Sequence, residues 1–171
     1  MGDTGSDSGR REDWVVLVDP RWRSSAASDV PPSSMMVGAW MLDEGVPGPF
    51  EPNPGYMPAE DGAPSDPIDA VLRLAADGAD VGGEIVPAVR GAVVEVACDE
   101  HDQLMVGLSP DGIRCIAVVT AATHKRHVEA QRWNPVLGRM LPQVLPSGVD
   151  IMVNPGSPAQ FRLRAEALGP E

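Results

Sequence analysis

Two short hydrophobic runs, separated by a polar loop, open the patterned part of the chain. Residues 14–18 (WVVLV) are apolar and rich in β-branched side chains, and an Asp-Pro pair ends them, which predicts a buried β-strand. Residues 35–43 (MMVGAWMLD) form a second apolar run that ends at a Glu-Gly pair and predicts a second strand. The chain therefore begins its fold with short strands.

Prolines then interrupt the chain over about residues 47–67, a segment that we call the Pro-rich arm. Each proline lacks an N–H group and restricts the residue before it, so we expect neither a continuous strand ladder nor a helix here. The apolar side chains of an extended arm could recognise a partner, or they could pin the arm to the protein's own core. We expect these side chains to pin the arm to the core, because aromatic residues make up only 4% of the chain and usually lie in the core. The candidate binding residues of the arm are Phe50, Asn53, Tyr56 and Met57.

Residues typical of the start and the end of a helix follow the arm. Asp66 is placed to cap a helix, Pro67 suits the first helical position, and an apolar stripe at helical spacing runs from there until Gly78. A second short helix is predicted over residues 84–90, in which Pro87 is tolerable only within the opening turn.

Three apolar runs come next, at residues 93–97, 104–108 and 113–120, and short polar turns join them. This pattern predicts an antiparallel meander. In a meander, Cys98 and Cys115 would lie on the outer strands, too far apart for a disulfide bond. We therefore expect two free, mostly buried thiols.

The last third of the chain mixes predicted helices with two closing strands. Residues 122–133 (ATHKRHVEAQRW) are polar and predict a surface helix, and apolar positions over residues 136–144 predict another short helix. Apolar runs at 151–153 and 161–163 predict strands on either side of an Asn-Pro-Gly turn. We expect mainly a structural turn, in which Gly156 takes a positive φ.

The same turn has a functional interpretation. Its backbone N–H groups could bind an anion or the carboxylate of a partner, which makes Asn154 and Gly156 candidate binding residues.

Together these patterns predict an α+β fold with a mainly antiparallel β-sheet and short helices packed on one face. The first two strands are expected to extend this sheet or to pack beside it. We expect residues 1–12 to be a disordered tail and residues 13–171 to form one domain.

Charge narrows the range of partners. Asp and Glu number 25 against 13 Lys and Arg, giving a formal net charge of −12, which repels phosphate backbones and anionic lipid surfaces. We therefore expect no nucleic-acid partner. The chain has no apolar run long enough to span a bilayer, and its start is polar, so we expect no stable membrane insertion and a cytoplasmic location.

Few residues are candidates for catalysis. His124 and His127, with Glu129 nearby, have a spacing that could hold a metal, but they stand among charges that include Lys125 and Arg126, which disfavour a cation. The acidic neighbours of Cys98 would raise its pKa and so weaken it as a nucleophile. We expect no catalytic residues, no metal and no cofactor.

A resemblance to known families adds a cellular context. LPSGVDIMVNPGSPAQFRLRAEAL resembles the C-terminal signature of SseB-like domains. The serial order of WVVLVDP, VGAWMLDEG, GPFEPNPGYMP, SDPIDAVLRLAADG and SPDGIRCIAVVTAATHKRHV is similar to the actinobacterial type VII secretion system-associated proteins. The resemblance covers about residues 14–168 and implies an SseB-like α+β domain.

The resemblance also implies a function, although it carries over no catalytic residues. It implies a non-catalytic accessory protein of type VII (ESX) secretion that binds a secretion component or substrate protein, with homo-oligomerisation left open. The alternative is a small-molecule-binding or regulatory module of the SseB type, and a hydrolase or metal enzyme ranks third. A binding module should show an apolar patch or an open sheet edge, whereas an enzyme should show a closed pocket with convergent titratable groups.

Overall fold

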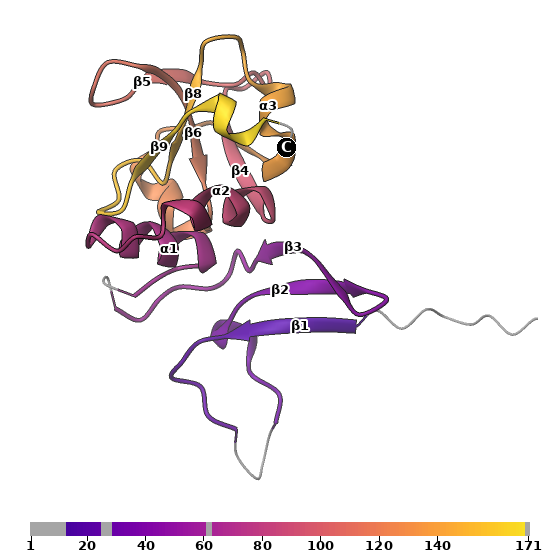
Figure 1. Ribbon diagram of the computed structural model, residues 1–171. Helices are drawn as coiled ribbons and strands as arrows, with labels where there is room; N and C mark the ends of the chain where they lie inside the picture. The colour runs from indigo at the N-terminus through magenta and orange to yellow at the C-terminus, as the bar shows by residue number, and fades with distance from the viewer. Residues whose placement is uncertain (1–12, 25–28, 61–62, 170–171) are drawn as a thin grey trace, which may run out of the picture.

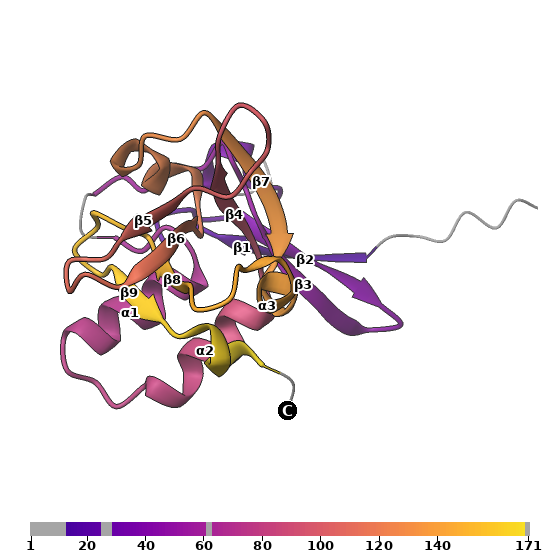
Figure 2. The same ribbon diagram turned by 90° about the horizontal axis from the view of Figure 1, so that it is seen from above.

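The protein is an α+β structure with a three-stranded sheet and a six-stranded sheet, as the computed structural model shows (Figures 1 and 2). The structure describes residues 13–24, 29–60 and 63–169. The predicted tail at residues 1–12 lies outside these ranges. Mainly antiparallel pairing and short helices confirm the predicted fold class.

The first sheet contains the two N-terminal strands predicted from the sequence and a third strand. Its order is β1-β2-β3 with antiparallel pairing, and the strands are β1 (Asp13–Val18), β2 (Met36–Asp43) and β3 (Val46–Pro52). A short 3-10 turn, Ser33–Met35, precedes β2. The prediction that β1 is buried was wrong, because β1 is an edge strand and its first four residues are exposed.

The Pro-rich arm also differs from its prediction, because its first part forms a strand ladder. β3 pairs with β2 although it contains Pro47, Pro49 and Pro52. An edge strand tolerates proline because one side of its backbone needs no partner within the sheet. The N–H of Phe50 instead donates to the carbonyl of Gly91, 2.8 Å away, which joins the first sheet to the rest of the molecule.

Two helices follow the arm, as predicted. α1 (Pro67–Ala76) begins at the Asp66 cap, whose side chain accepts hydrogen bonds from two backbone N–H groups of the first turn. α2 (Gly82–Arg90) starts two residues before its predicted start, 84, so the prediction that Pro87 lies within the opening turn was wrong, and Pro87 lies inside the helix. In Figure 1, β3 is the strand of the first sheet nearest to these helices. Within the described ranges, no helix is both long enough and apolar enough to cross a membrane.

The second sheet holds most of the core. Its order is β7-β4-β6-β8-β9, with β5 pairing with β6, and only β6 and β8 run parallel. The strands are β4 (Val93–Cys98), β5 (Val106–Leu108), β6 (Arg114–Val119), β7 (Arg132–Leu137), β8 (Asp150–Val153) and β9 (Phe161–Leu163). The predicted meander was wrong in one respect, because β4 and β6 are direct neighbours.

The two helices predicted after β6 are largely replaced by a strand. Residues 122–127 form a 3-10 turn, Ala122–His127, and the chain then enters β7, whose six residues all pair with β4. Only a 3-10 turn, Gly138–Met140, and the one-turn helix α3 (Leu141–Val144) remain of the second predicted helix. Long-range pairing with β4 outweighs the local helical pattern. A last 3-10 turn, Ala165–Leu168, follows β9.

The core lies where α1 and α2 pack against the second sheet. Leu72 and Val89 from the helices join Val96, Ile116 and Ile151 from the central strands, and all five are buried. Each such side chain contributes about 1.5–3 kcal/mol through burial. The central strands of the second sheet and the two helices therefore form the hydrophobic core of the protein.

Both cysteines are free and buried, as predicted, although β4 and β6 lie side by side. Burial raises the pKa of both the Cys98 and the Cys115 thiol, which lowers the thiolate fraction at neutral pH.

We expect both thiols to react slowly with a thiol reagent in the folded protein and fast after unfolding in denaturant. A mass measured without reductant that is lower than the mass of the reduced protein by the two thiol hydrogens lost in a disulfide would contradict this expectation.

Candidate functional site

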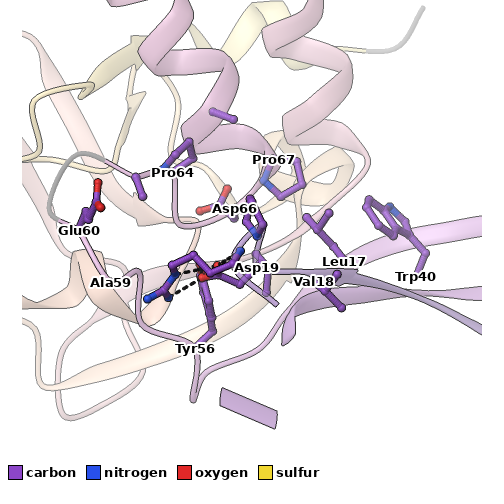
Figure 3. A pocket seen from close by; sticks show the side chains of 15 residues that line it. Leu17, Val18, Asp19, Trp40, Tyr56, Ala59, Glu60, Pro64, Asp66 and Pro67 are labelled. Carbon is purple, nitrogen blue, oxygen red and sulfur yellow. Dashed lines mark hydrogen bonds and ion pairs between the residues drawn. The ribbon is translucent and has the colours of Figure 1, made fainter. Parts of the chain in front are cut away.

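A cavity of about 580 Å³ opens between the first sheet, the Pro-rich arm and the start of α1 (Figure 3). Most of its wall is apolar. The side chains come from the end of β1, the middle of β2, the arm and the first turn of α1, and they include Leu17, Val18, Val37, Trp40, Tyr56, Ala59, Ala63, Pro64, Pro67 and Ala70. Segments far apart in the sequence thus form one hollow.

One polar cluster stands in this wall, centred on the Asp19 carboxylate. Asp19 is 3% exposed and accepts hydrogen bonds from Arg21 Nε at 2.9 Å, Arg21 Nη2 at 2.7 Å and the Tyr56 hydroxyl at 2.8 Å. The hydrogen bonds from Arg21 hold the pKa of Asp19 well below its usual range. Burial, together with the bond to Asp19, raises the pKa of Tyr56 to about 12. The cluster ties the end of β1 to the arm, as Figure 3 shows.

The predicted arm residues divide between core, turn and surface. Phe50 and Tyr56 are each 4% exposed, and the ring of Phe50 lies 4.8 Å from that of Trp40, so both aromatic residues pin the arm to the core. Asn53 holds a turn, because its Nδ2 donates to the carbonyls of Ser33 and Met36. Met57 is exposed. Among the six predicted binding residues, only Tyr56 lines the cavity.

The Asn-Pro-Gly turn has its predicted backbone shape. Asn154 and Gly156 have φ of 49° and 76°. Asn154 is completely buried, its Oδ1 accepts from the N–H of Thr120 at 2.9 Å, and its Nδ2 donates to Thr120 Oγ1 at 2.8 Å. The N–H groups of Asn154 and Gly156 donate to the Val118 carbonyl and to Gln160 Oε1. Because these groups bond within the protein, the geometry favours the structural interpretation.

A second buried polar cluster lies where α1 meets β6. Asp66 Oδ2 accepts from Thr120 Oγ1 and from Ser65 Oγ, both at 2.7 Å, while Oδ1 accepts from the N–H groups of Ile68 and Asp69. Burial raises the pKa of Asp66. The cluster connects the helix start to the end of a central strand.

His124 belongs to this cluster, so the expectation that it stands among exposed charges was wrong. It lies in the 3-10 turn Ala122–His127 and is 4% exposed, and its Nε2 lies 2.8 Å from Ser65 Oγ. Burial lowers the pKa of His124. Asp69 Oδ1 lies 3.9 Å from the same Nε2.

The Ser65 and His124 pair does not have the geometry of a catalytic triad. A triad places its carboxylate on the ring nitrogen opposite the nucleophile, whereas Asp69 approaches the nitrogen that faces Ser65. Ser65 is also 2% exposed, which keeps its hydroxyl away from a substrate. Within the described residues, no group of three or more His, Cys, Asp and Glu side chains is arranged to hold a metal ion.

The outer edge of β1 is a second candidate surface. Among the described residues β1 pairs with β2 alone, and Trp14, Val15 and Val16 are 43%, 46% and 39% exposed. Met41 lies opposite Trp14 in the register, so Trp14, Val16 and Met41 share one face of the sheet. β1 contains no proline and no Lys or Arg, the residues that commonly block an edge, whereas β3 contains three prolines.

Sequence reasoning missed the cavity, the Asp19 cluster and the β1 edge. The Asp-Pro pair after WVVLV predicts only the end of a strand, yet the carboxylate of Asp19 is the centre of the cavity's polar wall. An aspartate between an apolar run and an arginine two residues later was the available signal. No family model, curated protein or solved structure compared with this chain matches it.

The Asp19 cluster should make stability depend on pH. The pKa of Asp19 is lower in the folded than in the unfolded state, so its contribution is present above the unfolded value of about 4 and is lost as pH falls through the folded value. We expect Asp19→Asn to be less stable than the wild type near neutral pH. The difference should shrink as pH falls below about 4.

Urea unfolding of both proteins across this pH range measures the difference. Taking the difference cancels the contributions of other carboxyl groups, including Asp66. A stability gap between the two proteins that stays constant down to about pH 2 would contradict the role of Asp19.

Asn154→Ala should destabilise the protein, because it leaves the N–H of Thr120 unpaired in the core and places alanine at a positive φ. We expect a loss of about 1–3 kcal/mol in the free energy of unfolding, measured with urea. Asn134→Ala is the control, because Asn134 is only half-buried and makes longer contacts. Equal stability of Asn154→Ala and the wild type would instead favour a binding role for the turn.

Proposed function

We propose that this protein is a non-catalytic accessory protein associated with type VII secretion that acts by binding another protein. The observation that carries the proposal is the outer edge of β1, which pairs with no strand among the described residues, beside exposed Trp14, Val15 and Val16. An open edge and an apolar patch are what a binding module should present. The type VII context comes from the resemblance in the order of the sequence motifs.

The mode of binding is strand addition. A partner segment in extended conformation pairs with the outer backbone groups of β1, and this main-chain pairing supplies affinity. Alternate side chains of that segment then contact the face formed by Trp14, Val16 and Met41, which supplies specificity. The blocked edge at β3 leaves β1 as the strand of the first sheet that is suited to this pairing.

Charge and chemistry support a protein partner in the cytoplasm. The net charge of −12 disfavours nucleic acid as the partner. The two buried free thiols suit a reducing compartment. The titratable side chains of Asp66 and His124 each form a hydrogen bond with Ser65 in the interior, which favours a structural role for them.

The test is affinity capture of the tagged protein from its own cells, with the captured proteins identified by mass spectrometry. We expect the wild type to capture a type VII secretion component or substrate. The double substitution Trp14→Lys with Val16→Lys should reduce that capture at least tenfold, because charged residues on an edge strand oppose pairing. Both positions are partly exposed, so the melting temperature should stay close to that of the wild type.

Leu108→Lys with Val144→Lys is the matched control, because both residues are exposed apolar positions outside the first sheet. This control should capture the partner as the wild type does. The proposal fails if no secretion component is captured, or if the β1 variant folds and captures the component as well as the control does.

A further inference from the structure

We infer that the cavity between the first sheet and α1 is a binding site for one uncharged, largely apolar small molecule. Its volume of about 580 Å³ falls within the range of small-molecule sites, about 300–1,000 Å³. Three alanines, Ala59, Ala63 and Ala70, supply short side chains where larger ones would fill the space. This inference goes beyond the proposed function, because it concerns another surface and another class of ligand.

The chemistry of the wall selects against a charged ligand. The Asp19 carboxylate is occupied by Arg21 and by the Tyr56 hydroxyl, and the Asp66 carboxylate accepts four hydrogen bonds from protein groups. A charged head group that entered the buried part of the cavity would therefore lose its hydration without gaining a new buried partner there. The exposed carboxylate of Glu60, which lines the same cavity, adds repulsion against anions.

The same argument selects a small molecule over a peptide. A peptide backbone carries a donor and an acceptor at nearly every residue, and each would need a partner in the wall. The buried polar groups of the wall, Asp19, Tyr56 and Asp66, are bonded to protein groups, as Figure 3 shows for Asp19 and Tyr56. An apolar molecule needs no such partners and gains free energy by leaving water.

Trp40 provides a direct reporter. It lines the cavity and is partly exposed, so a bound molecule would change the environment of its indole. The probes are 1-decanol, decanoate and decylamine, which have equal chain length and differ in the charge of the head group. Binding is measured by isothermal titration calorimetry on the full chain. Because the chain has four tryptophans, it is located by the part of the fluorescence change that Trp40→Phe removes.

We expect 1-decanol to bind with one-to-one stoichiometry and to change the Trp40 fluorescence, and both decanoate and decylamine to bind at least tenfold more weakly. Ala70→Leu should weaken 1-decanol binding at least tenfold by filling the cavity. Ala76→Leu is the matched control, because Ala76 is an exposed residue of the same helix that does not line this cavity, and it should bind as the wild type does. Should Ala70→Leu fail to fold, Ala59→Leu at the exposed side of the cavity replaces it.

Absence of saturable 1-decanol binding would overturn the inference, as would equal binding of decanoate or of decylamine. Equal affinity in the filled variant and the Ala76→Leu control would also overturn it, because the alcohol would then bind elsewhere. The Trp14→Lys with Val16→Lys protein should still bind 1-decanol. Partner capture and 1-decanol binding, both measured on this variant, therefore separate a failure of the proposed function from a failure of this inference.

Discussion

The buried carboxylate of Asp66 is the interaction on which most of the structure depends. One of its oxygens caps α1, and the other accepts hydrogen bonds from Thr120 and Ser65. Thr120 in turn bonds Asn154 in the turn that follows β8. A helix start, the end of a central strand and the turn between the last two strands are therefore held by one connected set of polar groups. Such a network stabilises the fold only while every member is bonded.

The attachment of the first sheet to the rest of the molecule creates the cavity. The N–H of Phe50 donates to the Gly91 carbonyl, and the ring of Phe50 packs on Trp40, so β3 and β2 are fixed beside the helices. The end of β1 is held by the Asp19 and Tyr56 hydrogen bond. Between these attachments, small side chains do not fill the space between α1 and the sheet. This unfilled space is the cavity.

β1 connects the two surfaces for which functions are proposed. Its outer edge pairs with no strand among the described residues, and its last residues, Leu17 and Val18, line the cavity. A partner strand on β1 would lie close to the cavity, whose polar wall begins at Asp19, the residue after the strand. The two sites thus share one short segment while relying on different interactions, which are main-chain hydrogen bonds at the edge and apolar burial in the cavity.

The sequence by itself determined the features that depend on neighbouring residues. The Asp66 cap, the short α1, the apolar central strands and the turn at Asn154 follow from local hydrogen bonding and side-chain periodicity, and the α+β class follows from their order. The tertiary structure alone decided the exposure of β1, the strand at β7, the burial of His124 and the cavity around Asp19. Each of these depends on which distant segment packs beside it, and the pattern of a single segment does not contain that information.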